Sequence, residues 1–513
     1  MFWNNKNLGR FGKQLNNQIS LLQAGDYSSI SWIFCVFSET HAASKELAAK
    51  ALCEALGKMT FDDLVRVDER MRQTTSMEWS INWKQFSLES FFSRKMSEPE
   101  RRAVIIFASF NPNGFIRERA VRLMKDYPGT LSFAILRQND WVQQVRTASV
   151  ETTDYRLAHL SKGELLSALP FADKLGRSGR LQRQNAAIKR IFTALTMQLS
   201  EDDLLEGLKS ENIRTRRLCT DALFTNEPPR FDLAFDRLKS EIDPFLRAGI
   251  FRRLMTAGQN MRLAIEQFIK DSYPQNRLLA SQFIYDTDKE AALQTAIVLL
   301  LDKSAMVREN SRAYLCSQKI EFNYRTYYKS NLITKTAPAI MGLAESGNVE
   351  DTVEIEGYLK SSHIAVVRAA MTAVMRLNGA KYIPAITEFL ADERSGIVKT
   401  ARNLIKKTDS PDYTRIMQIF KTTQYENTKQ KCFSILMSAS KWQRLIYILD
   451  VLEIGGTDIE EKANDALDRW IMTYNRSYAT ASREQVQEIS EAIIRLERKL
   501  SEKVRKNLLF LLR

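Results

Sequence analysis

The stretch HIAVVRAAMTAVMRLNG, residues 363–379, places Arg368 directly after two valines and continues in small and apolar residues. Alanine, leucine and methionine favour helices, and the apolar positions are dense enough to bury one side. We therefore predict a buried helix with an arginine at its edge. Three further stretches repeat an aliphatic residue, a cation and then small residues: VQQVRTASV with Arg146, SAMVRENSRAYL with Arg308, and SGIVKTARNLI with Lys399.

Looser versions of this motif extend the series along the chain, at Arg117, Arg183, Arg214, Arg247, Arg277, Lys335, Lys429 and Lys462. From the first to the last, successive cations lie about 31 residues apart, which indicates a structural repeat. Polar residues precede many of the motifs, at 139–140, 210–211, 240–244, 302–304, 361–362 and 392–396. Such residues end one helix and begin the next. Each repeat is therefore predicted to be a helix, a short polar turn and a second helix that begins near the cation.

This pattern resembles the HEAT-like helical repeats, in particular the short bacterial variety, in which an acidic turn precedes Val-Arg and a run of alanines. The likeness covers roughly residues 101–474. It implies a right-handed α-solenoid of stacked antiparallel helix pairs, with about 11–13 repeats of roughly 31 residues. It also implies that Arg368 and its counterparts stack between repeats and bind turn carboxylates or carbonyls. Ankyrin and tetratricopeptide signatures are absent from the sequence.

The composition agrees with an all-α protein, because 513 residues include only 19 Gly and 11 Pro. The chain exceeds the size at which one compact core keeps growing. Its formal net charge of +14 permits association with nucleic acid, an anionic membrane or an acidic protein. Five scattered cysteines predict reduced, mostly buried thiols and a cytoplasmic location. The most apolar early run, residues 30–37, is too short to span a bilayer, so no membrane insertion is expected.

The flanks differ from the repeat array. Residues 1–100 are predicted to form an N-terminal helical cap, and residues 475–513 a C-terminal helical cap. The N-terminal region contains an aromatic stretch that either packs within the cap or forms a docking surface, with Trp79, Trp83, Phe86, Phe91 and Phe92. The C-terminal stretch is amphipathic, and its acidic residues weaken the alternative of membrane adsorption.

Catalytic constellations are missing from the sequence. The three histidines, His41, His159 and His363, stand apart from any zinc or triad motif, and no phosphate-binding glycine loop occurs. Cys316 has no histidine near it in sequence, so burial is the expectation for its thiol. The sequence favours a protein that is not an enzyme and predicts no cofactor and no metal.

Cations on the predicted second helices are the candidate binding residues. Second helices of HEAT-like arrays line the concave face, where repeated cations would form a positive groove for phosphates, or simply a solvated face. The candidates are Arg119, Arg122, Arg177, Arg180, Arg183, Arg216, Arg217, Arg252, Arg253, Arg312, Arg376, Arg402 and Lys406. A further aromatic and basic stretch, residues 321–335, could stack bases or pack on neighbouring helices.

Two functions follow from these features. The first is a non-enzymatic scaffold that holds a protein partner on its concave surface. The alternative is nucleic-acid binding in a basic concave groove. Some HEAT-like proteins are DNA glycosylases that use Trp and Asp in the groove, and here Trp141 beside Asp140 would be the place for that chemistry. The bilin lyases share short HEAT-like repeats, but nothing in the sequence marks a chromophore site.

Overall fold

The computed structural model describes residues 11–160, 163–177, 193, 197, 199–225 and 228–512. These residues form helices and turns and contain no strand, so the all-α prediction is confirmed. The chain divides into two compact units, Met1–Gln267 and Phe268–Arg513. The predicted boundaries near residues 100 and 474 both fall inside a unit, and the two predicted caps remain predictions.

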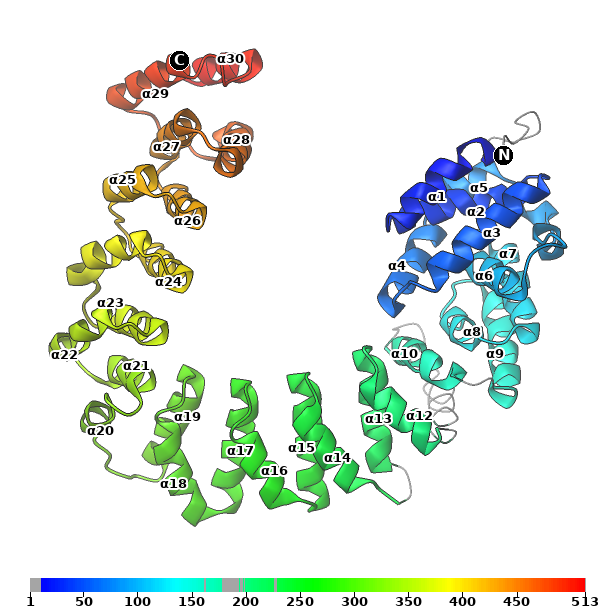
Figure 1. Ribbon diagram of the computed structural model, residues 1–513, viewed down its shortest axis with the longest axis horizontal. Helices are drawn as coiled ribbons and strands as arrows, with labels where there is room; N and C mark the ends of the chain where they lie inside the picture. The colour runs from blue at the N-terminus through cyan, green and yellow to red at the C-terminus, as the bar shows by residue number, and fades with distance from the viewer. Residues whose placement is uncertain are drawn as a thin grey trace. The chain divides into compact units, whose positions relative to one another are not determined.

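Unit 1 contains the helices α1 (Leu15–Gln23), α2 (Ile30–Cys35), α3 (Ala42–Leu56), α4 (Phe61–Arg72), α5 (Thr75–Ser80), α6 (Glu98–Ala108), α7 (Gly114–Leu123), α8 (Leu131–Arg137), α9 (Gln143–Ala158), α10 (Glu164–Gly176), α12 (Glu201–Lys209), α13 (Ile213–Thr225), α14 (Phe231–Ser240) and α15 (Pro244–Ala257). Helix α16 (Met261–Phe268) runs up to the boundary between the units. From α6 onward the helices alternate as first and second members of a pair, and Figure 1 shows α12 to α15 stacked in this manner.

Unit 2 continues the pairing with α17 (Pro274–Thr287), α18 (Lys289–Leu299), α19 (Ala305–Ser317), α20 (Tyr324–Ser330), α21 (Thr336–Ser346), α22 (Thr352–Glu356), α23 (Ile364–Glu388), α24 (Ser395–Ile405), α25 (Tyr413–Thr422), α26 (Glu426–Leu436), α27 (Lys441–Ile454), α28 (Thr457–Met472), α29 (Arg483–Arg495) and α30 (Glu502–Leu511). Figure 1 shows these pairs following one another, from α18 and α19 in green to α29 and α30 in red. One apolar core runs through the unit, from Ala296 to Leu508.

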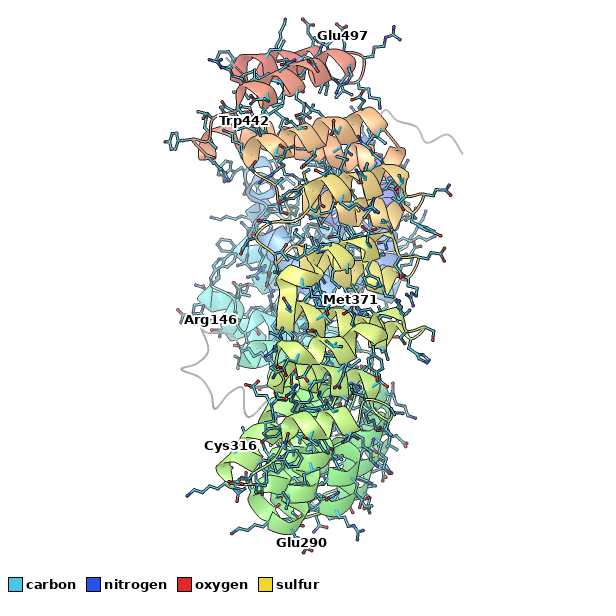
Figure 2. All side chains as sticks on the ribbon, turned by 90° about the vertical axis from the view of Figure 1, so that its left-hand side faces the viewer. Arg146, Glu290, Cys316, Met371, Trp442 and Glu497 are labelled. Atoms are coloured by element: carbon cyan, nitrogen blue, oxygen red, sulfur yellow. The ribbon has the colours of Figure 1, made fainter. Side chains whose placement is uncertain are left out.

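The opening stretch of sequence forms the first part of α23. This helix is two helices joined at Asn378, whose backbone is not helical (φ −153°, ψ 64°). Residues 364–377 are the second helix of one pair, and residues 379–388 are the first helix of the next. The inward side of the first part is fully covered, including Val367, Ala370 and Met371, and Figure 2 shows Met371 among the stacked helices.

Nine turns within the described helix pairs share one arrangement. In each, a polar side chain accepts a hydrogen bond from the backbone amide two residues later and so begins the second helix. We name these the turn residues: Asn111, Asp140, Ser210, Glu241, Asp271, Asp302, Ser361, Asp392 and Thr423. Asp140, Ser210, Glu241, Asp302, Ser361 and Asp392 lie in the polar segments that the sequence predicts to separate the helices, and for these turns the prediction is confirmed. Asn111, Asp271 and Thr423 lie in turns that the sequence analysis did not single out.

The aromatic stretch of unit 1 is mostly packed. Trp83 is buried, donates from its indole nitrogen to the carbonyl of Met77 at 2.9 Å, and contacts the rings of Phe86 and Phe91. Trp79 differs, because 85% of its surface is exposed. Packing therefore accounts for the centre of the stretch and leaves one tryptophan on the surface.

Candidate binding surfaces

Buried and half-buried arginines connect the turns of successive helix pairs. In each case an arginine six residues after a turn residue donates from Nη1 to that residue's carbonyl. We name them the turn arginines: Arg117, Arg146, Arg216, Arg247, Arg277 and Arg308. Several also form an ion pair with a carboxylate farther along the chain, as Arg216 does with Glu241 and Arg277 with Asp302. The guanidinium fork suits this double task, because it presents separate donors to a carbonyl and to a carboxylate.

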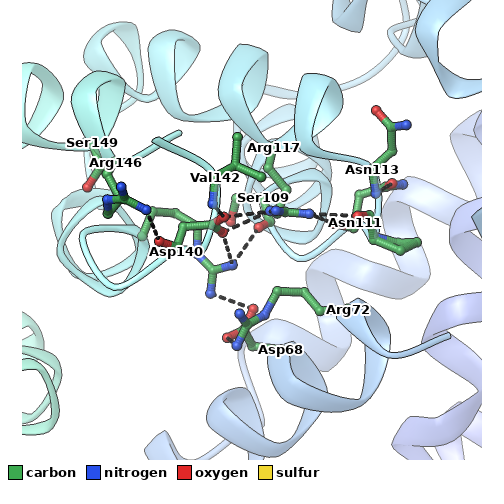
Figure 3. A network of polar contacts seen from close by, with 12 residues as sticks. Asp68, Arg72, Ser109, Asn111, Asn113, Arg117, Asp140, Val142, Arg146 and Ser149 are labelled. Carbon is green, nitrogen blue, oxygen red and sulfur yellow. Dashed lines mark hydrogen bonds and ion pairs between the residues drawn. The ribbon is translucent and has the colours of Figure 1, made fainter. Parts of the chain in front are cut away.

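The contacts around Asp140 show the turn arginine in detail (Figure 3). Arg117 donates to the two Asp140 oxygens at 2.8 and 2.9 Å and to the carbonyls of Asn111 and Pro112 at 2.9 and 2.7 Å. Arg137 lies on the other side of Asp140 at 3.5 Å and pairs with Asp68 of α4 at 2.5 Å. Burial opposes ionisation of Asp140, but the hydrogen bond and charge of Arg117 outweigh it and keep the pKa of this carboxyl below its usual value.

These contacts remove Asp140 from the proposed glycosylase chemistry. A catalytic carboxylate must reach a substrate, whereas Asp140 is 1% exposed and saturated by two arginines and the amide of Val142. Trp141 is about half exposed, and the guanidinium of Arg117 lies 4.6 Å from the centre of its ring. Asp140 and Trp141 are therefore part of a structural turn. The interpretation of these two residues as a glycosylase site is wrong.

Three of the sequence-based assignments of the repeat cation are out of phase, those of Arg214, Arg368 and Lys399. For Lys399, the position six residues after Asp392 is occupied by the buried Val398. Arg216, not Arg214, is the turn arginine of its repeat, and it is buried between Glu241 and the carbonyls of Ser210 and Glu211. Arg216 is consequently not available as a surface contact, contrary to the prediction. Arg214 is half-buried instead and pairs with Asp62 and Asp173.

Arg368, the arginine of the opening stretch, is also out of phase. The turn-arginine position of its repeat is occupied by Val367, which is buried, while Arg368 is exposed and donates to the Thr400 hydroxyl. Arg394 replaces the missing donor: it reaches the carbonyls of Ser361 and Ser362 at 3.3 Å and pairs with Asp392 at 2.8 Å. The expected stacking role of Arg368 is therefore wrong, and its charge faces solvent.

Several other candidate cations are paired with carboxylates within the chain. Arg122 pairs with Glu118 at 3.0 Å and Glu151 at 3.2 Å. Arg312 pairs with Glu345 at 2.9 Å, where the turn arginine Arg308 also binds. Arg119 is exposed and donates to the carbonyl of Phe86. Arg180 and Arg183 lie outside the described residues.

The aromatic and basic stretch of residues 321–335 is packed rather than open for stacking. Tyr328 is fully buried, and Tyr327 donates from its hydroxyl to the carbonyl of Ile297 at 2.9 Å. Arg325 and Lys329 both bind the buried carboxylate of Asp351. These side chains hold α20 against its neighbours.

Three of the predicted cations meet in one groove of unit 1. Arg177, Arg217 and Arg253 line a concavity of about 630 Å³ together with Arg214, which the sequence singles out only as a repeat marker. The groove lies over the second helices α13 and α15, and α4 and α10 contribute its remaining walls. Arg252 is exposed on α15 but does not line it.

Carboxylates neutralise the arginines of this groove. Asp173, which is nearly buried, binds Arg177 at 3.3 Å, Arg214 at 3.4 Å and also Arg217. Asp221 pairs with Arg253 at 2.7 Å. Burial raises the pKa of Asp221 despite the opposing charges of Arg253 and Arg217. With Asp62 and Asp243 also in the lining, the groove holds both signs of charge.

Apolar surface and stacked guanidinium groups complete the groove. Phe245 is 69% exposed and Ile213 is 43% exposed, and both line it. The guanidinium of Arg214 lies 4.8 Å from the ring centre of Phe61, and that of Arg253 lies 5.4 Å from the ring centre of Phe224. Sequence reasoning missed Phe245 because it follows Pro244 in the first turn of α15, where an apolar residue has no distinctive pattern.

In unit 2 the remaining candidates have no carboxylate partner among the described residues. Arg402 donates to the Ser434 hydroxyl and to the Asn403 side chain, both at 2.8 Å. Arg376 and Lys406 are exposed. Burial and the neighbouring charge of Arg402 lower the pKa of Lys406.

Within the described ranges, no three or more His, Cys, Asp or Glu side chains gather in a way that could hold a metal ion. None of the described helices combines the length and apolarity needed to cross a membrane. The thiol of Cys316, expected to be buried, is exposed, and Figure 2 shows it at the edge of its helix pair.

No protein-family model and no curated protein matches the chain. Among solved structures, importin-β is 13% identical, with 99% of this chain and 81% of that chain covered and a TM-score of 0.35. Yeast importin-β (Kap95p) is 13% identical, with 98% and 66% covered and a TM-score of 0.29. UNC-45 from Drosophila melanogaster is 10% identical, with 95% and 81% covered and a TM-score of 0.18. All three are HEAT- or armadillo-type α-solenoids, and at these identities the likeness concerns the fold alone.

Proposed function

We propose that this HEAT-like α-solenoid is a non-enzymatic scaffold that holds a protein partner in the groove of unit 1. The observation that carries the proposal is the lining of that groove, where Phe245 and Ile213 are exposed beside four arginines whose directions are fixed by carboxylates. Interfaces between proteins concentrate their binding energy in aromatic residues and arginines of this kind.

The charge balance of the groove supports a protein rather than a nucleic acid. Affinity for a phosphate backbone comes mainly from cations that are free to replace its counterions. Here Asp173, Asp221 and Asp62 already occupy the guanidinium groups and would repel phosphates at short distance. A protein surface carries both signs of charge and can exchange with these pairs, and its apolar side chains can cover Phe245.

Site-specific photocrosslinking tests the proposal. A benzoylphenylalanine at position 245 should form adducts with a protein partner in cells of the native host, because this side chain is exposed in the groove. The matched control is position 263 on α16, where Leu263 is 51% exposed outside the groove. We expect adducts at position 245 and none at position 263. The yield of each adduct should fall in the Arg253→Ala variant.

Two results would overturn this function. Equal adducts at both positions would mean that the groove is not the binding surface. Saturable binding of a single-stranded or duplex oligonucleotide in the groove, lost steeply between low and physiological salt and abolished by Arg217→Ala, would establish the nucleic-acid alternative instead. The expected result of that titration is no saturable binding at physiological salt.

A further inference from the structure

Two neighbouring second helices of unit 2 carry cations without carboxylates. Residues 364–377 of α23 and all of α24 contain no Asp or Glu. We define the basic face of unit 2 by five cations on or beside these helices: Lys303, Arg368, Lys399, Arg402 and Lys406. None forms an ion pair with a carboxylate in the described part of the chain, unlike the four arginines of the unit 1 groove.

Helix geometry places these cations on the solvent side. Lys399, Arg402 and Lys406 are three and four residues apart along α24 and therefore share one face. Ile397, Val398 and Ala401 form the opposite, buried side. On α23 the exposed residues around Arg368 continue this surface, since Arg368 reaches across to Thr400 of α24.

Hydroxyl groups hold two of the arginines in place without neutralising them. Arg368 donates from Nε to the Thr400 hydroxyl at 2.9 Å, and Arg402 donates from Nε to the Ser434 hydroxyl at 2.8 Å. Each bond joins one second helix to the next. Because these hydroxyls are neutral, as is the Asn403 side chain that also accepts from Arg402, each guanidinium keeps its full charge to attract an anion.

A small apolar depression lies within the basic face. It has a volume of about 380 Å³, and its lining includes Lys303 and Arg368 together with Ala337, Pro338 and Met341. No aromatic ring lines it. An aliphatic side chain fits such a lining, whereas single-stranded nucleic acid uses aromatic rings for base stacking.

We propose that the basic face of unit 2 binds an acidic, extended segment of a protein partner, with an aliphatic side chain of that segment seated between Lys303 and Arg368. Charge complementarity supplies the attraction, and the apolar depression selects a peptide over a polyphosphate. This surface is separate in the sequence from the groove of unit 1. Either proposal can therefore fail while the other holds.

Fluorescence anisotropy on the full chain tests this inference. The probe is a fluorescein-labelled peptide of alternating Glu and Val, about 12 residues long and thus ~40 Å when extended. A Glu and Gly peptide of equal charge reports on the apolar depression, and oligo(dT) of equal charge reports on phosphate binding. We expect the Glu and Val peptide to bind most tightly, with an affinity that falls as salt rises.

Paired variants locate the site. Arg368→Ala with Lys399→Ala should weaken peptide binding about tenfold, as expected for two lost rim contacts. The matched control is Lys360→Ala with Lys421→Ala, which removes two exposed cations from first helices of the same unit and should leave binding unchanged. Circular dichroism spectra confirm that each variant is folded. Charge reversal by Lys399→Glu and Arg402→Glu should abolish binding.

Three outcomes would overturn the inference: equal losses in the two paired variants, oligo(dT) binding more tightly than the peptide, or peptide binding that is sensitive only to Arg253→Ala in unit 1. The last outcome would leave the groove of unit 1 as the binding site. If no adducts form at position 245 while the peptide still binds, the proposed function of the unit 1 groove is refuted. The proposal for the basic face of unit 2 then still holds.

Discussion

Replacing Arg117 by alanine should destabilise unit 1 more than any change to an exposed cation. Arg117 is fully buried and makes four hydrogen bonds, two to Asp140 and two to the carbonyls of Asn111 and Pro112. Removing one partner of a buried ion pair costs about 3–5 kcal/mol, because the other charge is left without compensation. Asp140 keeps Arg137 and the amide of Val142, which lowers the cost. The two carbonyls lose their donor, which raises it.

We therefore expect Arg117→Ala to lower the free energy of unfolding by about 3–5 kcal/mol, a large part of the ~5–15 kcal/mol typical of a domain. Arg117→Lys should recover part of this loss, since lysine keeps the charge but lacks the fork. The matched control is Arg368→Ala, at a residue with the same sequence motif. This variant loses only an exposed hydrogen bond to Thr400, so its free energy of unfolding should fall by less than about 1 kcal/mol.

Hydrogen exchange read by mass spectrometry separates the two units, since their stabilities need not be equal. Amides of α7 and α9 should lose protection in Arg117→Ala, and those of α23 and α24 should keep it in Arg368→Ala. A loss below about 1 kcal/mol in Arg117→Ala, or equal losses in the two variants, would refute the structural role of the turn arginines.

The remaining predictions concern pH, packing and thiol reactivity. Hydrogen bonds and arginine charges keep the pKa values of three buried carboxyls below their usual range against the effect of burial. The donors are Arg117 for Asp140, the Asp243 amide and then Arg216 for Glu241, and Arg308 for Glu345. The unfolded chain therefore binds more protons in acid, and the free energy of unfolding, followed by urea titration, should be fully retained above about pH 5 and fall as pH drops below about 4; a flat profile to pH 3 would contradict this. Gly342→Ala should lower the melting temperature, because the added methyl group would overlap the buried ring of Tyr328, at a cost of about 1–3 kcal/mol; an unchanged melting temperature would show that the ring can move. Iodoacetamide should modify the exposed Cys316 of the folded chain much faster than Cys219 and Cys432, whose burial raises the pKa of each thiol to about 12; equal rates by peptide mapping would show that the buried thiols open readily.

The sequence predicts the helix pairs well, because the period and the turns are local properties. A polar residue that begins a helix accepts a hydrogen bond from the amide two residues later, as Asp302 does from Ser304. Such a polar residue therefore recurs in the sequence from repeat to repeat. The position of the cation relative to the turn residue is harder to predict. In IRTRR, residues 213–217, three arginines compete for one structural role, and only the position six residues after Ser210 reaches its carbonyl. Counting from the turn residue, rather than matching Val-Arg, would have identified Arg216 and excluded Arg368.

The binding surfaces could be predicted only in part, because their character depends on partners that are distant in sequence. Asp62, Asp173 and Asp221 decide the charge of the unit 1 groove, and none of them belongs to the motif that marks the arginines. The positions of Lys174 and Arg177 in the sequence likewise say nothing of Glu69 and Asp173, with which they pair. Pairing between repeats, and not the number of cations, determines which of them face a ligand.

The same reasoning changes the meaning of the net charge of +14. Arg117, Arg137, Arg216 and Arg308 count toward the total, yet they are buried against carboxylates and cannot bind a partner. What attracts a partner is a cation whose fixed contacts are neutral, and Arg368 meets that condition through Thr400, and Arg402 through Ser434 and Asn403. The hydroxyl partners are therefore as informative as the arginines: replacing Thr400 or Ser434 by Asp would keep the arginine in place, cancel its charge, and should weaken binding of the acidic peptide as much as removing the arginine does.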